Sequence, residues 1–291
     1  WEAKTPSIKR TWTCVKQVKQ LLPSCRIVLC GDHVTAEPAE SQAHCPVDVV
    51  LLGGDYDFGI QQIVREVSSP NLLPVIRAQW NEPTTNDLTT LPVIDRTLCQ
   101  WKRYSRMGNY LYRPGTHGYS ARDCWWRHEG GCTFCSWTNT YKNYRQLSVD
   151  QFMADVESAH ALGAREYFDD AGTWAPPGTW ATAALERLRQ LNHGRRHHTA
   201  PLCIGCNDRP GARGRDDYRA MATSGFRFIL FGLESANLET LQRINKGQHA
   251  EDMRNAARDA SQAGLHPHLT VMFGYQWETK DDAEKTVSLV R

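Results

Sequence analysis

The chain has 291 residues, of which 41% are hydrophobic and 23% are charged. This composition is ordinary for a globular protein with a buried core, and no apolar stretch approaches the ~20 residues of a spanning helix, which excludes a membrane protein. The 34 basic and 32 acidic residues leave a formal charge of +2, so the net charge does not indicate nucleic-acid binding.

The first hundred residues alternate between predicted helices and strands. Apolar residues at three- and four-residue spacing predict a helix over Arg10–Leu22. The apolar runs Arg26–Cys30 and Val47–Leu52 predict two buried strands, with a helix over Glu37–His44 between them. Such strands are typical of a parallel α/β sheet, which binds ligands beyond the carboxyl ends of its strands. Two glycine-bearing loops, 31–35 and 53–55, follow these strands.

A stretch rich in Pro, Asn and Thr, from Pro70 to Arg106, predicts a hairpin or irregular linker at a domain boundary. We therefore divide the chain into a first domain over residues 1–100, which includes this linker, and a second over 101–291. Because there is no initial Met, we expect the numbering to start inside a longer protein.

The second domain repeats a pattern of helix, glycine and strand. Helices are predicted over Ser148–Leu162, Asp216–Ala222 and Asp252–Ala263, each followed by a glycine and an apolar strand. Ser148 and Gln151 form a predicted capping box. Successive βα units favour a parallel barrel or open sheet with an active site at the carboxyl ends of its strands.

Three cysteines lie close together in the segment CWWRHEGGCTFC, which follows a predicted strand over 118–121. Cys124, Cys132 and Cys135 fall within twelve residues, and three thiolates at this spacing can bind one soft metal centre. The centre is either zinc, with His117 or His128 as a fourth ligand, or an iron–sulfur cluster. The spacing alone does not distinguish the two.

This segment resembles the radical S-adenosylmethionine (radical SAM) superfamily, in which a three-cysteine loop after the first barrel strand holds a 4Fe–4S cluster. The resemblance implies that Phe134, the aromatic residue before the last cysteine, lies near the adenine of S-adenosylmethionine. The usual spacing is CxxxCxxC, whereas this chain has seven residues in the first gap. Cys124 is taken as the first ligand because it is the only upstream cysteine nearby.

Further motifs follow in the order of that family. Asp169 and Asp170 end the second barrel strand, Glu234 and Ser235 belong to a GLES segment, and Glu278 belongs to a GYQWET turn. The resemblance places these five residues on the S-adenosylmethionine side. Carboxylates at strand ends can accept charge-assisted hydrogen bonds from an ammonium group. Alternatively, the two aspartates end a solvated strand and Ser235 caps the following helix.

The amino-terminal residues are similar to the cobalamin-binding domain that precedes many radical SAM barrels. The similarity rests on CGDHVTAEP, on VDVVLLGGDYDFGIQQIV and on a Leu-Pro-x-x-Asp element at Leu91–Asp95. It implies cobalamin, with His33, Gly54 and Asp55 on the cobalamin side. Only two strands are evident, and no DxHxxG motif for an axial histidine occurs. We expect an incomplete doubly wound (Rossmann-like) domain and then a partial (β/α)6 barrel truncated at its carboxyl end.

The resemblance implies an enzyme whose 4Fe–4S cluster cleaves S-adenosylmethionine reductively to a 5′-deoxyadenosyl radical, which abstracts hydrogen from a substrate. Methyl transfer to carbon with cobalamin is the expected outcome, and oxidative cyclisation or rearrangement is the alternative. A zinc-binding structural module on the same cysteines remains a third possibility. Expected partners are a small-molecule substrate and an electron donor such as flavodoxin or ferredoxin, without nucleic acid. No catalytic residue is assigned.

The remaining cysteines carry less information. Cys203 and Cys206 form a second CxxC on a predicted strand, where cysteines usually pack in the core rather than bind metal. Ten unevenly spaced cysteines in a long chain without an apolar signal segment favour reduced thiols, and hence a cytoplasmic protein.

Overall fold

The computed structural model describes residues 4–66, 74–77, 86–105, 110–141, 143–192 and 202–291. The chain forms two compact units. The first comprises Trp1–Asp87 and Phe134–Asn143, and the second comprises Leu88–Thr133 and Tyr144–Arg291. The second unit thus begins 13 residues before the boundary set by the linker composition, and a ten-residue segment from the middle of the chain belongs to the first.

The first unit contains a parallel sheet with the order β1-β2-β3, formed by Val28–Leu29, Val49–Leu52 and Val75–Arg77. Successive residues of β2 pack on opposite faces. Val50 and Leu52 join one hydrophobic cluster, while Val49 and Leu51 join the other. Both faces are therefore covered, as in a doubly wound domain. Its helices are η1 (Thr5–Ser7), α1 (Ile8–Leu21), α2 (Asp32–Ala36), α3 (Pro38–His44), α4 (Tyr56–Glu66) and α6 (Trp137–Thr140).

The first unit differs from the sequence expectation at two places. The segment after β1, expected as a loop, forms the short helix α2. Strand β3 lies inside the stretch expected to be a hairpin or linker, where its three residues are too few for a periodicity signal. Of the predicted linker, residues 70–73, 78–85 and 106 lie outside the described ranges.

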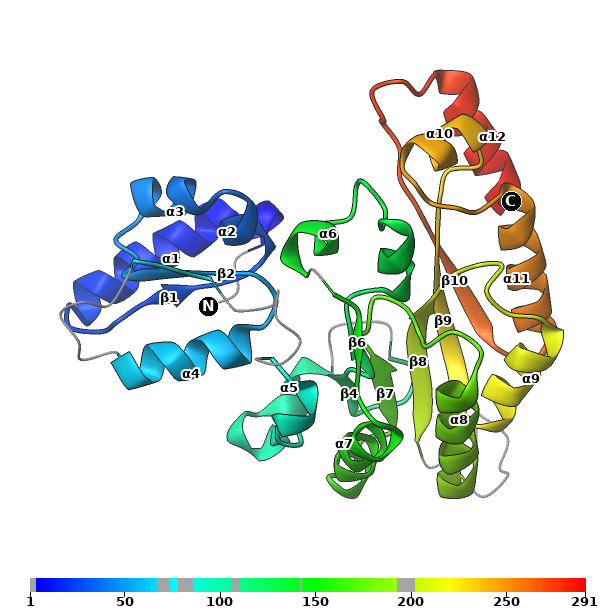
Figure 1. The fold of residues 1–291 in the computed structure, drawn as a ribbon, viewed down its shortest axis with the longest axis horizontal. Helices are drawn as coiled ribbons and strands as arrows, with labels where there is room; N and C mark the ends of the chain where they lie inside the picture. The colour runs from blue at the N-terminus through cyan, green and yellow to red at the C-terminus, as the bar shows by residue number, and fades with distance from the viewer. Residues whose placement is uncertain (1–3, 67–73, 78–85, 106–109, 142, 193–201) are drawn as a thin grey trace. The chain divides into compact units, whose positions relative to one another are not determined.

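The second unit is built on a five-stranded parallel sheet with the order β10-β9-β8-β7-β4. The strands are β4 (Gly115–Gly118), β7 (Glu166–Asp169), β8 (Cys203–Asp208), β9 (Phe226–Glu234) and β10 (His266–Val271). Each strand lies beside the next of the set in chain order, which is the progression of a βα barrel, and helices line one face (Figure 1). These are α7 (Val149–Ala161), α8 (Thr179–Asn192), α9 (Arg215–Thr223) and α11 (Ala250–Gln262).

The second unit also contains smaller elements and a carboxyl-terminal helix. They are η2 (Leu88–Thr90), η3 (Arg96–Leu98), α5 (Trp101–Tyr104), β5 (Ala121–Arg122), η4 (Trp125–Glu129), β6 (Arg145–Gln146), α10 (Leu238–Arg243) and α12 (Lys280–Val290). The strand predicted over 118–121 is wrong: the sheet strand β4 ends at Gly118, and β5 pairs antiparallel with β6.

Local signals in the sequence are confirmed elsewhere in the second unit. Ser148 and Gln151 form the capping box that opens α7. Gly163, Gly225 and Gly264 all adopt positive φ after their helices, as expected for left-handed helix ends. None of the described helices is both long and apolar enough to cross a membrane.

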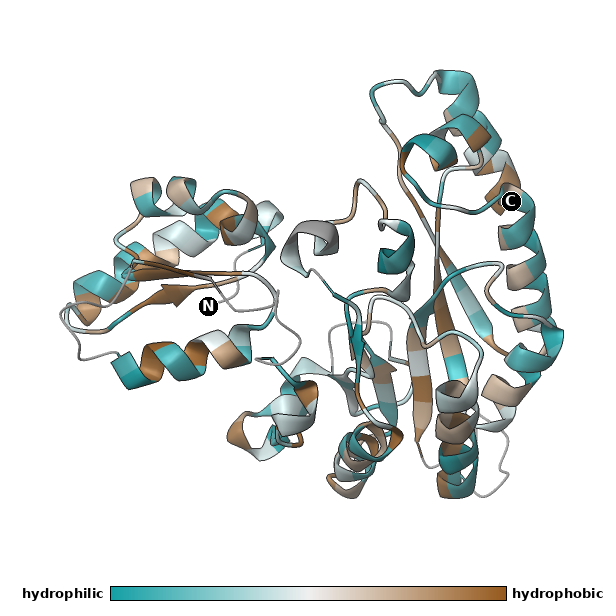
Figure 2. Ribbon diagram, in the orientation of Figure 1, coloured by the Kyte–Doolittle hydropathy of each residue, from teal (hydrophilic) through white to brown (hydrophobic). Residues whose placement is uncertain are grey.

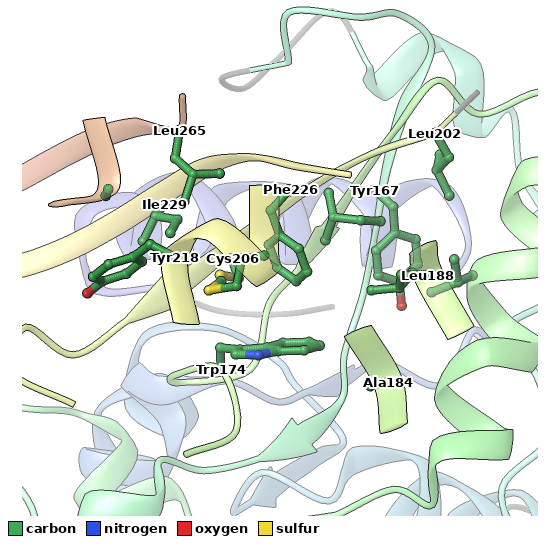
Figure 3. Packing of buried hydrophobic residues seen from close by; sticks show 14 of the residues in the cluster. Tyr167, Trp174, Ala184, Leu188, Leu202, Cys206, Tyr218, Phe226, Ile229 and Leu265 are labelled. Carbon is green, nitrogen blue, oxygen red and sulfur yellow. The ribbon is translucent and has the colours of Figure 1, made fainter. Parts of the chain in front are cut away.

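The main hydrophobic core lies between this sheet and its helices. Trp174 is fully buried, and its ring meets those of Phe152 and Phe226 edge-on, with centroid distances of 5.6 Å and 5.1 Å. Figure 3 shows Trp174 below Phe226, with Tyr167 and Leu188 in the same cluster. Figure 2 shows the same arrangement by hydropathy: many apolar residues lie on the strands, and many polar residues lie on the outer helices.

Candidate functional site

The three-cysteine segment leaves the sheet after β4 and turns sharply. Cys124 precedes η4, and the helix ends at Gly130, which adopts a φ of 89° and is followed by Gly131 at 72°. Asp123 is also left-handed, with a φ of 70°. Its carboxylate accepts two hydrogen bonds from the Arg127 guanidinium, at 2.6 Å and 3.1 Å. This ion pair stabilises the start of the three-cysteine loop.

Burial and charge act together on the Cys124 thiol. Burial raises the pKa of Cys124 to about 11; the Trp126 amide and the Arg209 charge oppose this shift, and Cys132 adds to it. These effects place Cys124, Cys132 and Arg209 in one cluster. Because a metal centre binds cysteine as thiolate, a centre here must displace the Cys124 proton at neutral pH.

Arg209 is a buried cation beside these thiols. It follows β8, is 6% exposed, and lies over the Trp126 ring with its guanidinium carbon 4.1 Å from the ring centroid. Burial lowers the pKa of Arg209, and the charges of Cys132 and Cys124 oppose that shift. The neighbouring carboxylate of Asp208 bonds Arg213 instead, at 2.8 Å. Arg209 therefore interacts with the same two thiols that would bind an iron–sulfur or zinc centre.

Cys124 and Cys132, two half-buried thiols of the second unit with a cation nearby, are donors that fit a soft metal centre. Within the described ranges, no three His, Cys, Asp or Glu side chains are arranged as a metal-ion site. Phe134 and Cys135 are half-buried and belong to the first unit, whereas Cys124 and Cys132 belong to the second. The assignment of the three cysteines as ligands and of Phe134 near the adenine therefore stays a prediction.

The two aspartates after β7 are in different environments. Asp169 is fully buried and accepts hydrogen bonds from the Ser120 amide at 2.7 Å and the Ser120 hydroxyl at 2.6 Å. Burial raises the pKa of Asp169 to about 6. Asp170 is exposed. Asp169 is therefore positioned to hold the loop after β4, and Asp170 is the one of the pair that solvent or a ligand can reach.

Tyr144 is a residue of this region that the motif comparison did not identify. Its hydroxyl is buried and has no hydrogen-bond partner among the residues that the structure describes. Burial raises the pKa of Tyr144, and the charges of Asp169 and Cys124 raise it further, so the three groups lie near one another. An unpartnered buried hydroxyl is free to bind an incoming ligand. No sequence pattern marks Tyr144, since its importance depends on contacts with β7 and the cysteine loop.

Glu234 ends β9 in a left-handed conformation, with a φ of 62°. Its carboxylate pairs with the Lys246 ammonium at 2.8 Å, and both side chains are buried. The sequence motif predicts that Glu234 lies opposite an ammonium group of a ligand. In this structure the ammonium group beside Glu234 is that of Lys246.

Ser235 and Glu278 lie together. The Ser235 hydroxyl donates to Glu278 Oε1 at 3.0 Å. Within the described part of the chain, the buried Glu278 Oε2 has no hydrogen-bond partner. Ser235 does not cap α10, because Asn237 lies closer to the helix and accepts from the amides of Glu239 and Thr240. The alternative cap assignment is therefore wrong, and the Glu278 oxygen remains available for a donor group.

Tyr275 connects these residues to the cysteine loop. Burial raises its pKa to about 12, with further contributions from the charges of Glu234, Glu278 and Cys132. The GLES segment, the GYQWET turn and the second cysteine therefore gather at the same end of the sheet. The order of motifs in the sequence did not show that Tyr275 is near all three of these groups.

The three residues predicted for the cobalamin side all have partners within the first unit. His33 Nε2 lies 2.9 Å from Glu40 Oε2. Asp55 is fully buried and accepts from the Asn86 amide at 2.7 Å. A Cβ at Gly54 would lie 2.1 Å from the Tyr141 ring, so glycine is required there for the approach of that side chain. The assignment of these three residues to the cobalamin side therefore stays a prediction.

The second CxxC is part of the sheet. Cys203 and Cys206 lie on β8, three residues apart, and therefore point to opposite faces. Both are buried, and burial raises the pKa of Cys203 to about 11. These features fit packing rather than metal binding.

The family model of the radical SAM superfamily matches residues 121–290, which include the whole cysteine loop and every strand from β7 to β10. Two curated relatives are similar over most of the chain. An uncharacterized methyltransferase of Pyrococcus horikoshii is 22% identical over 99% of this chain and 62% of its own length. The bacteriochlorophyllide d C-8(2)-methyltransferase of Chlorobaculum tepidum is 23% identical over 91% of this chain and 56% of its own.

Solved structures share the fold of both units. The radical S-adenosylmethionine methyltransferase TsrM of Kitasatospora setae, with cobalamin and a [4Fe-4S] cluster bound, matches with a TM-score of 0.75 at 14% identity. The alignment covers 98% of this chain and 57% of TsrM. The apo form of the cobalamin-dependent S-adenosylmethionine radical enzyme OxsB matches with a TM-score of 0.66 at 12% identity, over 99% of this chain and 42% of OxsB.

These matches cover the same α/β architecture that the sequence predicted, an incomplete doubly wound unit and a partial barrel. The chain spans only about 56–62% of the length of the two curated relatives. Because the family model matches more than half of the chain and includes the three-cysteine loop, the chain belongs to the radical SAM superfamily of enzymes.

Proposed function

We propose that this chain is a cobalamin-dependent radical SAM methyltransferase whose 4Fe–4S cluster is bound by Cys124, Cys132 and Cys135. The observation that carries the proposal is the family match over 121–290, with the cysteine loop at the carboxyl ends of a parallel sheet. A cluster bound there would supply the single electron for reductive cleavage of S-adenosylmethionine.

The residues of the second unit supply binding and orientation. Glu278 Oε2, buried and unpartnered, is suited to accept a hydrogen bond from an ammonium or hydroxyl group of S-adenosylmethionine. The Tyr144 hydroxyl, also unpartnered, can donate to the same ligand from the Cys124 side. Ser235 holds Glu278 at 3.0 Å and thereby orients its free oxygen. Asp169 holds the loop after β4 by accepting a hydrogen bond from the Ser120 amide.

Methyl transfer is favoured over cyclisation because both curated relatives are named methyltransferases. Cobalamin is included because TsrM and OxsB, whose folds match both units, are described with cobalamin. No side chain of the first unit is assigned to bind it, since the candidates His33 and Asp55 have partners within that unit. We further propose a small-molecule substrate, an electron donor such as flavodoxin or ferredoxin, and a cytoplasmic location, which suits a chain with ten reduced cysteines.

Metal analysis of the full chain, purified without oxygen and with cobalamin supplied, tests this proposal. We expect four iron and four sulfide per chain, and cobalt in addition. Iron and sulfide without cobalt would retain the radical SAM assignment and reject cobalamin. Zinc without iron, with His128 completing the site, would instead support the structural module.

Substitution distinguishes the two CxxC motifs. We expect Cys132→Ala to abolish reductive cleavage of S-adenosylmethionine and to lower the iron content, because it removes a ligand. Cys203→Ala changes a thiol that is buried in β8, and we expect cleavage to remain measurable. The products methionine and 5′-deoxyadenosine, quantified by chromatography, report the outcome. The reverse result would move the metal site to β8.

A further inference from the structure

The turn that follows α10 holds the peptide on both sides of Cys132. This clasp turn comprises residues 244–247, directly after α10 (Leu238–Arg243). On one side, the Thr133 amide donates to the Ile244 carbonyl at 3.0 Å. On the other, the Asn245 side-chain amide donates to the Gly131 carbonyl at 2.8 Å. Cys132 is therefore the residue between two hydrogen bonds from adjacent positions of one turn.

Asn245 also holds the residues of the first cysteine gap. Its side-chain amide donates to the Glu129 carbonyl at 2.9 Å, and its own carbonyl accepts from Trp126 Nε1 at 2.8 Å. Its φ of 51° is left-handed, a conformation that Asn tolerates better than most residues. A Cβ at Gly247 would lie 2.1 Å from the Trp126 ring, so the ring packs directly on the backbone of the turn.

The clasp turn is itself fixed to the sheet. Arg209, at the end of β8, donates to the Lys246 carbonyl. The Lys246 ammonium pairs with Glu234, at the end of β9, at 2.8 Å. Both connections are buried, with Lys246, Arg209 and Glu234 each less than 8% exposed. The position of Cys132 is thus fixed by contacts with the ends of two strands of the sheet, in addition to the contacts within its own loop.

The length of the first gap makes such support necessary. Seven residues separate Cys124 and Cys132, and a longer loop has more conformations to lose when its ends are fixed on one metal centre. The clasp turn removes that freedom before any ligand arrives. Outer groups that orient metal ligands commonly change metal affinity when they are substituted.

We propose that Asn245 is a positioning residue for Cys132, and that residues 244–247 preorganise the long C-x7-C-x2-C loop for cluster binding. This inference rests on the proposed function, because it requires Cys132 to be a cluster ligand. It goes beyond that function because it assigns a role to Asn245, which is 113 positions from Cys132 in the sequence and binds neither the metal nor the substrate.

Two substitutions at Asn245 test the inference. Asn245→Asp keeps the size of the side chain but replaces both N–H donors with a carboxylate facing two carbonyls. Asn245→Gly keeps the left-handed backbone and removes the side chain. The measurement is the rate at which iron leaves the reconstituted full chain in the presence of a chelator. We expect release about 10-fold or more faster than in the unsubstituted chain.

Asn237→Asp is the matched control at the other end of the same helix. Asn237 caps α10 through Oδ1, and Asp caps helices equally well, so this change should leave iron release unaltered. Circular dichroism and the thermal midpoint of the metal-free variants establish that the fold is retained. The electron paramagnetic resonance signal of the reduced cluster, which fold stability does not affect, should become heterogeneous only in the Asn245 variants.

The outcomes separate the inference from the proposed function. Failure of the unsubstituted chain to bind iron and sulfide would reject both. Normal cluster binding, with iron release in both folded Asn245 variants equal to that of Asn237→Asp, would reject the positioning role alone. If neither Asn245 variant folds, the turn is required for the fold rather than for Cys132, and the inference is likewise wrong. Faster release in folded variants with an altered resonance signal would support it.

Discussion

A buried guanidinium beside cysteine ligands is expected to affect the electronic properties of the metal centre. Arg209 has its guanidinium carbon 4.1 Å and 5.6 Å from the ring centroids of Trp126 and Trp125. Such stacking holds the cation in place while excluding water, which strengthens its field. A fixed positive charge favours the more negative, reduced state of a nearby cluster.

Arg209→Gln should therefore make the cluster harder to reduce. Removing the cation destabilises the added electron, so we expect the midpoint potential to become more negative. Arg209→Lys retains a positive charge but loses the planar stacking, and we expect a smaller shift in the same direction. A redox titration followed by electron paramagnetic resonance measures both. Equal potentials in all three proteins would show that Arg209 has only a packing role.

Asp169 should give the protein an identifiable pH dependence of stability. Burial raises its folded-state pKa from 3.8 to about 6, so the folded protein binds this proton more tightly than the unfolded chain. The stability that this proton contributes is complete below pH 4 and is lost as the pH rises through about 6. The loss attributable to this group is about 3 kcal/mol.

Asp169→Asn tests this assignment. Asn can still accept from the Ser120 and Ala171 amides and carries no titrating proton. We expect the difference in unfolding free energy between pH 4 and pH 7 to be smaller in the variant than in the unsubstituted protein, as measured by urea denaturation. Other titrating groups are common to both proteins and cancel in the comparison. If the difference in unfolding free energy between pH 4 and pH 7 were the same in both proteins, Asp169 would not be a group with a raised pKa.

Individual site residues were predictable from the sequence to the extent that they belong to compact motifs. The cysteines, Glu234 and Glu278 were proposed in this way, and their roles as ligands stay predictions. Asp169 and Asp170 could not be distinguished, because their burial is decided by Ser120, a residue 49 positions away. Tyr144 was not predicted, since nothing local to its sequence indicates an unpartnered buried hydroxyl.

At the scale of elements, Arg96 of the predicted linker joins β4 to a buried ion-pair network, because it donates to the Thr116 hydroxyl and the His117 carbonyl of that strand. Arg96 forms two 2.8 Å hydrogen bonds to the Asp155 carboxylate on α7, and the Tyr167 hydroxyl of β7 donates to the same carboxylate at 2.9 Å. All three side chains are buried. Removing one partner of such a network leaves an uncompensated buried charge, which is strongly destabilising.

Gly118→Ala should disturb this network without removing any of its members. A Cβ at Gly118 would lie 1.8 Å from the Tyr167 hydroxyl and 2.5 Å from the Asp155 carboxylate, so these buried groups must move. Overpacking of this kind typically costs about 1–3 kcal/mol. Gly178→Ala is the control, because the nearest atom to its Cβ would be 3.9 Å away. Equal thermal midpoints for the two variants would contradict the tight packing at β4.

The repeated pattern of helix, glycine and strand allowed α7, α9 and α11 to be predicted together with the strand after each, because these helices have an apolar face and a glycine end. Elements of two or three residues were not predicted. Strands β3 and β5 are too short for periodicity, and their existence depends on pairing with β2 and β6. Such pairing is a tertiary property.

At the scale of the whole molecule, the cysteine loop is continuous with a segment of the other unit. Phe134–Asn143 begins two residues after Cys132 and belongs to the first unit. There the hydroxyls of Ser136 and Thr140 each donate to the Asp32 carboxylate at 3.4 Å, and the Tyr141 ring packs on Gly54. The sequence placed this segment in the second domain by position, since no local pattern records contacts with residues about a hundred positions earlier.

Removal of residues 1–87 should therefore expose the segment next to the third cysteine. In a chain of residues 88–291, α6 and Tyr141 lose the partners Asp32 and Gly54, and we expect the segment to open readily. Limited digestion with chymotrypsin, which cuts after aromatic residues, should then cleave between 134 and 141 much faster than in the full chain. Phe152, fully buried in the core of the second unit, is the internal control and should stay protected in both. Equal cleavage rates in the two chains, with Phe152 protected, would show that the segment is held without the first unit.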